Sequence, residues 1–198
     1  MDQARLDYAK EFMKESVEVM TASSQDQVFL SAMLAIAAAI ENALRSGGKV
    51  MFAGNGGSAG DAQHIAGEFV SRLNFDRAPL AGLALTTDTS ILTAVGNDYG
   101  YDKVFERQIL GLGRAGDVFV GISTSGRSPS VVNALRAARS MGILTVCFAG
   151  KSPRNMAEWS DLKLSVASDR TPFIQQVHIT AAHIICGIVE EAIFGKKP

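Results

Sequence analysis

The sequence predicts an α/β protein in which a parallel β-sheet is covered by helices on both faces. Short apolar or β-branched runs alternate along the chain with segments long enough for helices, and this alternation is typical of such a sheet. The 198 residues, 47% of them hydrophobic, suit one domain, residues 1–198, with a well-buried core. Two of the apolar runs end in turns rich in glycine or serine, as expected where an open α/β sheet binds its ligand.

Two helices are predicted before the first strand. Apolar side chains recur at helical spacing over residues 6–20, which predicts an amphipathic helix. Residues 28–44 predict a second helix, and the Ser46-Gly47-Gly48 turn ends it.

Five strands and five further helices follow. The strands are predicted at residues 50–53, 80–85, 118–122, 144–148 and 162–166. The helices are predicted at residues 58–70, 90–95, 104–110, 128–141 and about 172–194. No repeat, linker or low-complexity tract interrupts this order.

Composition narrows the possible partners and compartment. The formal net charge is -1 and no basic run appears, so nucleic acid is not expected as a partner and an anionic ligand must be bound locally. Cys147 and Cys186 lie among apolar neighbours without CxxC spacing, which predicts buried free thiols and a reducing cytoplasm. The first residues are charged and the apolar patch at 35–39 is short, so neither secretion nor membrane insertion is expected.

Two loops of the same kind follow predicted strands and lead into helices. They are Gly54-Asn55-Gly56-Gly57-Ser58 and Ser123-Thr124-Ser125-Gly126-Arg127-Ser128. Free backbone N–H groups and the helix dipole at a helix start favour a phosphate. In the alternative interpretation, the serines only cap helices and the glycines only turn the chain. Two such loops at strand ends favour phosphate binding.

Nucleotide binding fits the same loops poorly. No Gly-Lys-Ser/Thr follows the glycines, so a Walker-type ATP site has no support. The segment Gly54 to Ala59 matches the dinucleotide pattern GxGxxA, but the acidic residue expected at the end of the next strand is missing, since Asp76 lies in the loop before it.

Histidines and acidic or amide side chains suggest a metal or proton-transfer site beside these loops. His64 and Glu68 are four residues apart and therefore share a helical face. On the last helix, Gln175 and His183 share one side, whereas His178 lies further round and is expected to be a hydrogen-bonded core residue. If the two helices face each other, a mixed N/O set suited to zinc or a similar divalent ion results: His64, Glu68, Gln175 and His183.

Three motifs, GNGGSAGDAQHIAGEF, STSGRS and IQQVHITAAHII, resemble those of the phosphoheptose isomerases of the sugar isomerase (SIS) domain superfamily over nearly the whole chain. The resemblance implies a single SIS domain with a flavodoxin-like three-layer sandwich. It also implies an aldose–ketose isomerase that converts sedoheptulose 7-phosphate to D-glycero-D-manno-heptose 7-phosphate through an enediol. That reaction is the first step of ADP-heptose synthesis for the lipopolysaccharide core.

The resemblance also assigns site residues. Glu68 is expected to be the base and His183 its partner acid/base, with one divalent metal, expected to be zinc, on His64, Glu68, Gln175 and His183. The residues expected to contact the substrate are Asn55, Gly56, Gly57, Ser58, Glu68, Asn97, Asp98, Ser123, Thr124, Ser125, Ser128 and Gln175. Some relatives carry an acidic residue where this chain has Thr171-Pro172-Phe173, and Asp169 lies nearby.

A homotetramer with active sites between subunits is implied as well, packed in part through the helices of residues 1–46. Two alternatives stay open. One is a tetrameric adaptor of the same fold that binds the bacterial replication initiator, and the other is an isomerase of a different sugar phosphate. The complete set of His64, Glu68, Gln175 and His183 beside an intact STSGRS loop favours the isomerase of the heptose phosphate.

Overall fold

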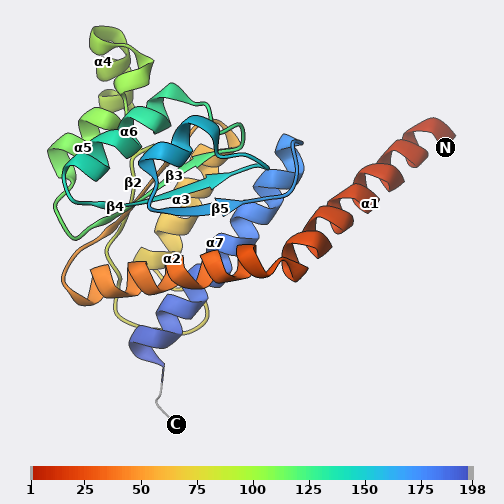
Figure 1. Cartoon of the computed structure of the whole chain (residues 1–198), viewed down its shortest axis with the longest axis horizontal. Coiled ribbons are helices and arrows are strands. Elements are labelled where there is room, and N and C mark those ends of the chain that lie inside the picture. The colour runs from red at the N-terminus through yellow and green to blue at the C-terminus, as the bar shows by residue number, and fades with distance from the viewer. Residues whose placement is uncertain (1, 196–198) are drawn as a thin grey trace.

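The structure, a computed structural model, describes residues 2–195 and contains a five-stranded parallel sheet between two layers of helices (Figure 1). The elements in chain order are α1 (Gln3–Gln25), α2 (Gln27–Arg45), β1 (Val50–Gly54), α3 (Gly57–Val70), β2 (Gly82–Ala84), α4 (Thr89–Tyr99), the 3-10 turn η1 (Tyr101–Lys103), α5 (Glu106–Leu112), β3 (Val118–Ser123), α6 (Pro129–Ser140), β4 (Leu144–Ala149), the 3-10 helix η2 (Arg154–Trp159), β5 (Leu162–Ser165) and α7 (Thr171–Phe194).

The strand order is β2-β1-β3-β4-β5, and every neighbouring pair is parallel. This is the flavodoxin-like order, so the predicted fold class is confirmed. Strands β1 and β3 are buried along their whole length, because helices cover both faces. Val50 and Phe52 of β1 belong to one core and Met51 and Ala53 to the other, as the two-residue period of a strand requires.

The two helical layers have different members. Helices α2, α3 and α7 pack on one face, where Phe52 and Val120 meet Ile36 and Ile185. Helices α5 and α6 cover the opposite face, and Figure 1 shows the sheet edge-on between them. The predicted three-layer sandwich is therefore confirmed, with the two glycine- and serine-rich loops at the carboxyl ends of neighbouring strands β1 and β3.

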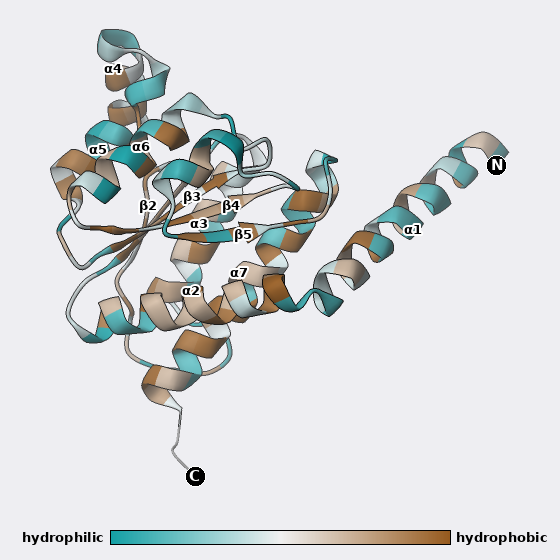
Figure 2. Ribbon diagram, viewed as in Figure 1, coloured by the Kyte–Doolittle hydropathy of each residue, from teal (hydrophilic) through white to brown (hydrophobic). Residues whose placement is uncertain are grey.

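Helix α1 extends away from the rest of the chain (Figure 1). It is attached where the Phe12 ring packs on Phe173, with ring centroids 4.7 Å apart, and where the Ser16 hydroxyl donates to the Gln176 side chain at 2.7 Å. Tyr8 and Met13 are 69% and 64% exposed. Hydrophobic bands alternate with hydrophilic ones along α1 in Figure 2, so this amphipathic helix leaves apolar side chains uncovered.

The predicted element boundaries are accurate for the long elements and less so around α4. The strand expected at residues 80–85 shrinks to Gly82–Ala84, and the helix expected at 90–95 runs over Thr89–Tyr99. The prediction of a helix at residues 104–110 was wrong in part. A 3-10 turn precedes α5, and α5 itself spans Glu106–Leu112. Gly100 ends α4 with a φ of 90°, a conformation that glycine adopts without strain.

Two helices, Gln27–Arg45 and Thr171–Phe194, are long and apolar enough to cross a membrane by length and composition alone. In the structure both cover the sheet, with Ile40 and Val177 among their core side chains. Core helices of this kind satisfy the same length and composition criteria. Cys147 and Cys186 are both free and buried, as predicted from their apolar neighbours.

His178 is a core histidine, as predicted. Its side chain is 1% exposed, and Nε2 donates a hydrogen bond to the carbonyl oxygen of Ala149 at 3.0 Å. Nδ1 has no hydrogen-bond partner among residues 2–195. Burial lowers the pKa of His178 from 6.5 to about 4, although the bond to Ala149 opposes the shift.

This buried ring should make the fold sensitive to mild acid. The unfolded chain takes up a proton at His178 below pH 6.5, while the folded chain stays neutral there down to about pH 4. Stability is therefore fully present above pH 6.5 and falls by about 3 kcal/mol as the pH approaches 4. Urea unfolding at fixed protein concentration and several pH values measures this fall in unfolding free energy. The fall should be smaller in a His178→Gln variant. An equal fall in the two proteins would refute the assignment.

Candidate functional site

The first loop connects β1 to α3 through a left-handed glycine. Gly56 is the N-cap residue with a φ of 57°, and no side chain caps the helix. The Ser58 and Ala59 N–H groups already bond to the carbonyl oxygens of Asn55 and Gly56, so the helix dipole is what this helix start offers an anion. A Cβ on Gly54 would lie 2.7 Å from the Ser58 Cβ, so the strand can meet the helix this closely only with glycine.

The second loop gathers three hydroxyl groups. The Ser123 Oγ lies 2.9 Å from the Ser128 Oγ and 3.4 Å from the Ser125 Oγ. Ser128 occupies the N-cap position of α6 but its side chain makes no capping hydrogen bond. Capping through the side chain therefore does not account for Ser128. Pro129 has no N–H and the Val131 N–H bonds to the Ser128 carbonyl oxygen at 3.1 Å, so the three hydroxyls and the helix dipole are what this loop offers an anion.

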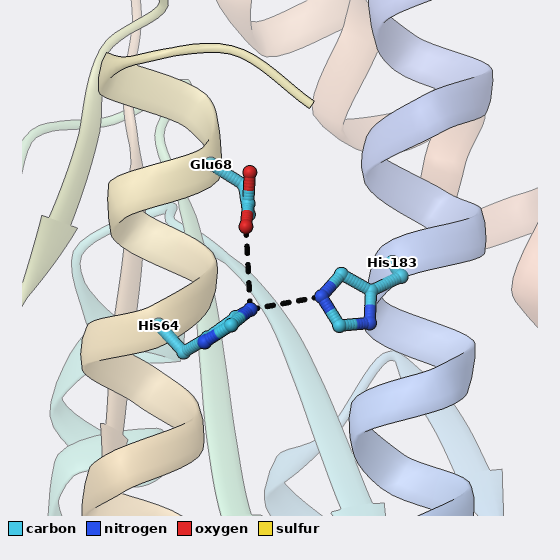
Figure 3. Close-up of side chains that lie close together, drawn as sticks. All are labelled: His64, Glu68 and His183. Carbon is cyan, nitrogen blue, oxygen red and sulfur yellow. Dashed lines mark hydrogen bonds and ion pairs between the residues drawn. The ribbon is translucent and has the colours of Figure 1, made fainter. Parts of the chain in front are cut away.

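Three of the four predicted metal ligands meet between α3 and α7. The His64 Nε2 lies 3.2 Å from the Glu68 Oε1 and 2.9 Å from the His183 Nε2. Figure 3 shows His64 and Glu68 on one helix pointing toward His183 on the other. One ligand atom from each residue lies within 4.8 Å of the other two. The two helices therefore do face each other, as this predicted site requires.

The donor set suits a divalent ion such as zinc. Ligands bound to zinc at about 2.0–2.1 Å in a tetrahedron lie roughly 3.3 Å from one another, close to the two separations from the His64 Nε2. Two imidazole lone pairs repel, so one of the facing Nε2 atoms must carry a proton when no cation is bound. A metal ion would replace that proton, as is usual when histidines bind metals.

Gln175 lies near the first loop. A Cβ on Gly57 would overlap the Gln175 carboxamide, so this side chain packs directly over the start of α3. Gln175 and His183 are eight residues apart, which is about 12 Å along a helix axis. In this structure the amide thus contacts the first loop.

Asn55 is held by two residues that sequence analysis did not identify. The Tyr101 hydroxyl donates to the Asn55 Oδ1 at 2.8 Å, and the Asn55 Nδ2 donates to the Ser130 Oγ at 3.1 Å. Asn97 and Asp98 are exposed near the end of α4, where the Asn97 Nδ2 donates to the Asp98 Oδ1 at 2.7 Å. Tyr101 follows this pair closely in sequence, but no pattern marks it as a contact of the first loop.

A buried ion pair links α7 to the loop that follows α3. The Arg77 and Glu190 side chains are 1% and 0% exposed and meet at 3.0 Å. Arg77 also donates to the carbonyl oxygens of Glu68 and Phe69, each at 2.7 Å, at the end of α3. Burial raises the pKa of Glu190, but hydrogen bonds from the Leu73 and Asn74 N–H groups and from Arg77 outweigh it and lower the pKa below 4.5.

Asp61 is a further titratable group on α3, one turn before His64. Its Oδ2 is buried without a hydrogen-bond partner in the described part of the chain. Burial raises the pKa of this carboxyl above 3.8, and the nearby His64 partly opposes the shift. Asp61 thus adds a carboxyl group whose proton is held more tightly than usual beside the metal candidates.

The fold and these loops define a class of protein. The family described as "SIS domain" matches residues 11–150, and this range contains both glycine- and serine-rich loops, His64 and Glu68. The chain is therefore an SIS-domain protein, as its motifs suggested.

More similar proteins identify the family within that class. A phosphoheptose isomerase of Burkholderia pseudomallei is 51% identical over the full length of both chains. One from Sulfurimonas denitrificans is 49% identical, covering 95% of this chain and 96% of its own. The solved phosphoheptose isomerase of Neisseria gonorrhoeae superposes with a TM-score of 0.88 at 38% identity, covering 94% of this chain and 98% of that chain. This chain belongs to the phosphoheptose isomerase family.

Proposed function

We propose that the protein isomerises sedoheptulose 7-phosphate to D-glycero-D-manno-heptose 7-phosphate, as the first step toward ADP-heptose and the lipopolysaccharide core. The names of its relatives support the phosphorylated heptose as substrate. One observation carries the proposal furthest. Glu68 and His183, from helices far apart in sequence, lie within 4.8 Å of each other and of His64, and helix α3, which carries His64 and Glu68, begins at the first phosphate-type loop.

Glu68 and His183 divide the proton transfers in this proposal. Glu68 removes a proton from C1 of the ketose while His183 donates one to the C2 carbonyl oxygen, which gives the enediol. His183 then takes the proton of the O1 hydroxyl and Glu68 returns one to C2, which gives the aldose. Both groups can reach adjacent carbons of one substrate because their ligand atoms lie within 4.8 Å.

His64, Glu68 and His183 would hold a divalent metal, for which we propose zinc. The separations of 2.9 and 3.2 Å from the His64 Nε2 support this assignment. When bound, the ion would polarise the substrate carbonyl and stabilise negative charge on its oxygen. We propose Gln175 as a fourth ligand that also contacts the substrate, which requires its carboxamide to swing from Gly57 toward His183.

We assign most of the remaining substrate contacts to the two loops. We propose that Ser123, Thr124, Ser125 and Ser128 hold the phosphate and that Asn55, Gly56, Gly57 and Ser58 contact the sugar. Asn97 and Asp98 would reach the sugar hydroxyls. The uncapped helix starts at Gly56 and Ser128 support anion binding at this edge of the sheet.

Removing the Tyr101 hydroxyl should weaken substrate binding through Asn55. The Tyr101→Phe variant loses the hydrogen bond that fixes the Asn55 carboxamide, so KM should rise by about threefold to tenfold with kcat nearly unchanged. Steady-state kinetics test this expectation. Tyr99→Phe is the matched control, because Tyr99 is similarly exposed and its ring stacks under Arg107. Equal KM values for the two variants would show that the Tyr101 hydroxyl does not contribute to substrate binding.

We also propose that residues 1–198 act as one domain in a cytoplasmic homotetramer with sites at subunit interfaces. The uncovered apolar side chains Tyr8, Met13 and Val17 of α1 support a role for residues 1–46 in this packing. In a tetramer these side chains would be buried against other copies of the chain.

Proton NMR in deuterated water tests the reaction. Sedoheptulose 7-phosphate is incubated with the protein plus zinc, and again after chelation. An aldoheptose phosphate carrying deuterium beside the carbonyl is the expected product, and its loss after chelation supports a required metal. A panel of pentose, hexose and heptose phosphates establishes specificity. If folded protein converts none of them under either condition, the proposal is wrong.

A further inference from the structure

A cavity of about 410 Å³ lies at the carboxyl ends of β3, β4 and β5. Thr124 and Ser125 form part of its wall, so it opens onto the loop assigned above to the phosphate. Arg127, Lys151 and Arg154 also line it. Three cations in one cavity are conspicuous in a chain whose formal net charge is -1.

Backbone contacts fix the three loops that build this cavity. The Gly150 N–H donates to the Thr124 carbonyl oxygen at 3.0 Å, and the Lys151 N–H donates to the Ser168 carbonyl oxygen at 3.0 Å. A Cβ on Gly126 would lie 2.6 Å from the Pro153 carbonyl oxygen, so the loops after β3 and β4 are in direct contact. The backbone that carries the three cations is therefore held in place beside the serine-rich loop before any ligand binds.

The charges of these three lining side chains are not neutralised by carboxylates of the described residues. Within residues 2–195, neither Arg127, Lys151 nor Arg154 has a carboxylate within 4.0 Å. Asp169, which also lines the cavity, is the carboxylate among its lining residues. The cavity thus presents positive charge to whatever the loop hydroxyls hold.

We propose that Arg127, Lys151 and Arg154 form a cationic subsite that captures the phosphate dianion of the sugar substrate together with Thr124 and Ser125. This inference rests on the proposed function and adds residues that determine affinity for the phosphate. Hydroxyls and backbone N–H groups are neutral donors, whereas hydrogen bonds from guanidinium or ammonium groups to a phosphate are roughly twice as strong. Their exposure also lets them attract the anion from solution, an effect that salt weakens.

Direct binding of inorganic phosphate provides a test that does not depend on catalysis. Isothermal titration calorimetry on the full chain compares wild type with an Arg127→Gln/Lys151→Gln/Arg154→Gln variant. The triple variant should bind phosphate at least about tenfold more weakly. The control removes the same charge from the outer surface of α5 and α6 as Arg107→Gln/Arg136→Gln/Arg139→Gln, and should bind as wild type does. Equal dissociation constants for all three proteins would overturn the proposal.

Steady-state kinetics distinguish a role of this subsite in binding from a role in catalysis. In the cavity variant the KM for the sugar phosphate should rise about tenfold or more with kcat unchanged, and KM should become less sensitive to salt than in wild type. A fall in kcat at unchanged KM would contradict a binding role. If wild type binds phosphate through the cavity but isomerises no sugar phosphate, the subsite stands and the proposed reaction fails.

Discussion

Glu68→Gln should lower turnover of sedoheptulose 7-phosphate by about 10²–10⁴-fold, the range that a positioned general base contributes. Glutamine keeps the size of the side chain and can still accept a hydrogen bond from the His64 ring, which lies 3.2 Å from the Glu68 carboxylate. It cannot accept a proton from carbon. The variant should therefore fold normally and still bind the sugar phosphate, while deuterium exchange beside the carbonyl disappears.

Loss of the base must be distinguished from loss of metal, because Glu68 is also a proposed ligand. Zinc content measured by mass spectrometry on both proteins supplies that comparison. If wild type and Glu68→Gln hold equal amounts of zinc, the lower turnover of the variant is due to lost proton transfer. Glu191→Gln is the matched control, since Glu191 is exposed on α7 next to the buried Glu190. Wild-type exchange rates in the Glu68→Gln variant would refute the role of this carboxylate as the base.

A double variant tests how Glu68 and His183 share the reaction. If they act on one proton path, Glu68→Gln/His183→Gln should be little slower than the slower single variant, since the effects of groups that act as a unit are not additive. If the two effects multiply, the groups act in separate steps. The comparison uses the kcat values of all four proteins at the same zinc concentration.

The sheet could be predicted because its strands carry local signals. Apolar runs such as residues 118–122 are short and bounded by polar turns, and they became buried strands in the parallel order that such alternation indicates. The region from residue 89 to 112 was harder to predict. Its helices are short and its connection contains a 3-10 turn, so no long hydrophobic period distinguishes one boundary from another.

For the site, too, contacts within one helix could be predicted and contacts between distant elements could not. His64 and Glu68 were predictable as a pair because four residues on one helix share a face. That His183 would meet them depends on how α3 and α7 cross, and packing between residues distant in sequence decides that crossing. The partners Arg77 and Glu190 are 113 residues apart and no motif connects them. A buried ion pair of this kind is visible only once the chain is folded.

Glu190→Ala should destabilise the protein by about 3–5 kcal/mol at neutral pH, because it leaves the buried Arg77 charge without its partner. Glu190 also accepts the Leu73 N–H at 3.0 Å and the Asn74 N–H at 2.8 Å. The substitution thus removes acceptors from a guanidinium and two backbone donors at once. Urea unfolding at one protein concentration measures the loss, and Glu191→Ala should change the unfolding free energy by less than about 0.5 kcal/mol.

The acid dependence of the ion pair has a definite sign. The pKa of Glu190 is lower in the folded chain than its ordinary value of 4.5. Its contribution to stability is therefore fully present above pH 4.5 and is lost as the pH falls through the folded pKa. The difference in unfolding free energy between wild type and Glu190→Ala should be constant from neutral pH down to about 4.5 and shrink below it. A difference that does not change with acid would contradict a charged Glu190.

The ion pair should also affect the metal candidates, since Arg77 donates to the Glu68 carbonyl oxygen at 2.7 Å while Glu190 lies on the helix of His183. Without Glu190, the hydrogen bonds that link Arg77 and the loop after α3 to α7 are lost, and zinc affinity should fall along with stability. Arg77→Met/Glu190→Leu removes both charges and should recover part of the unfolding free energy, as paired removal of buried charges often does. If zinc affinity stays low in that double variant, positioning of Glu68 against His183 depends on the ion pair itself rather than on stability alone.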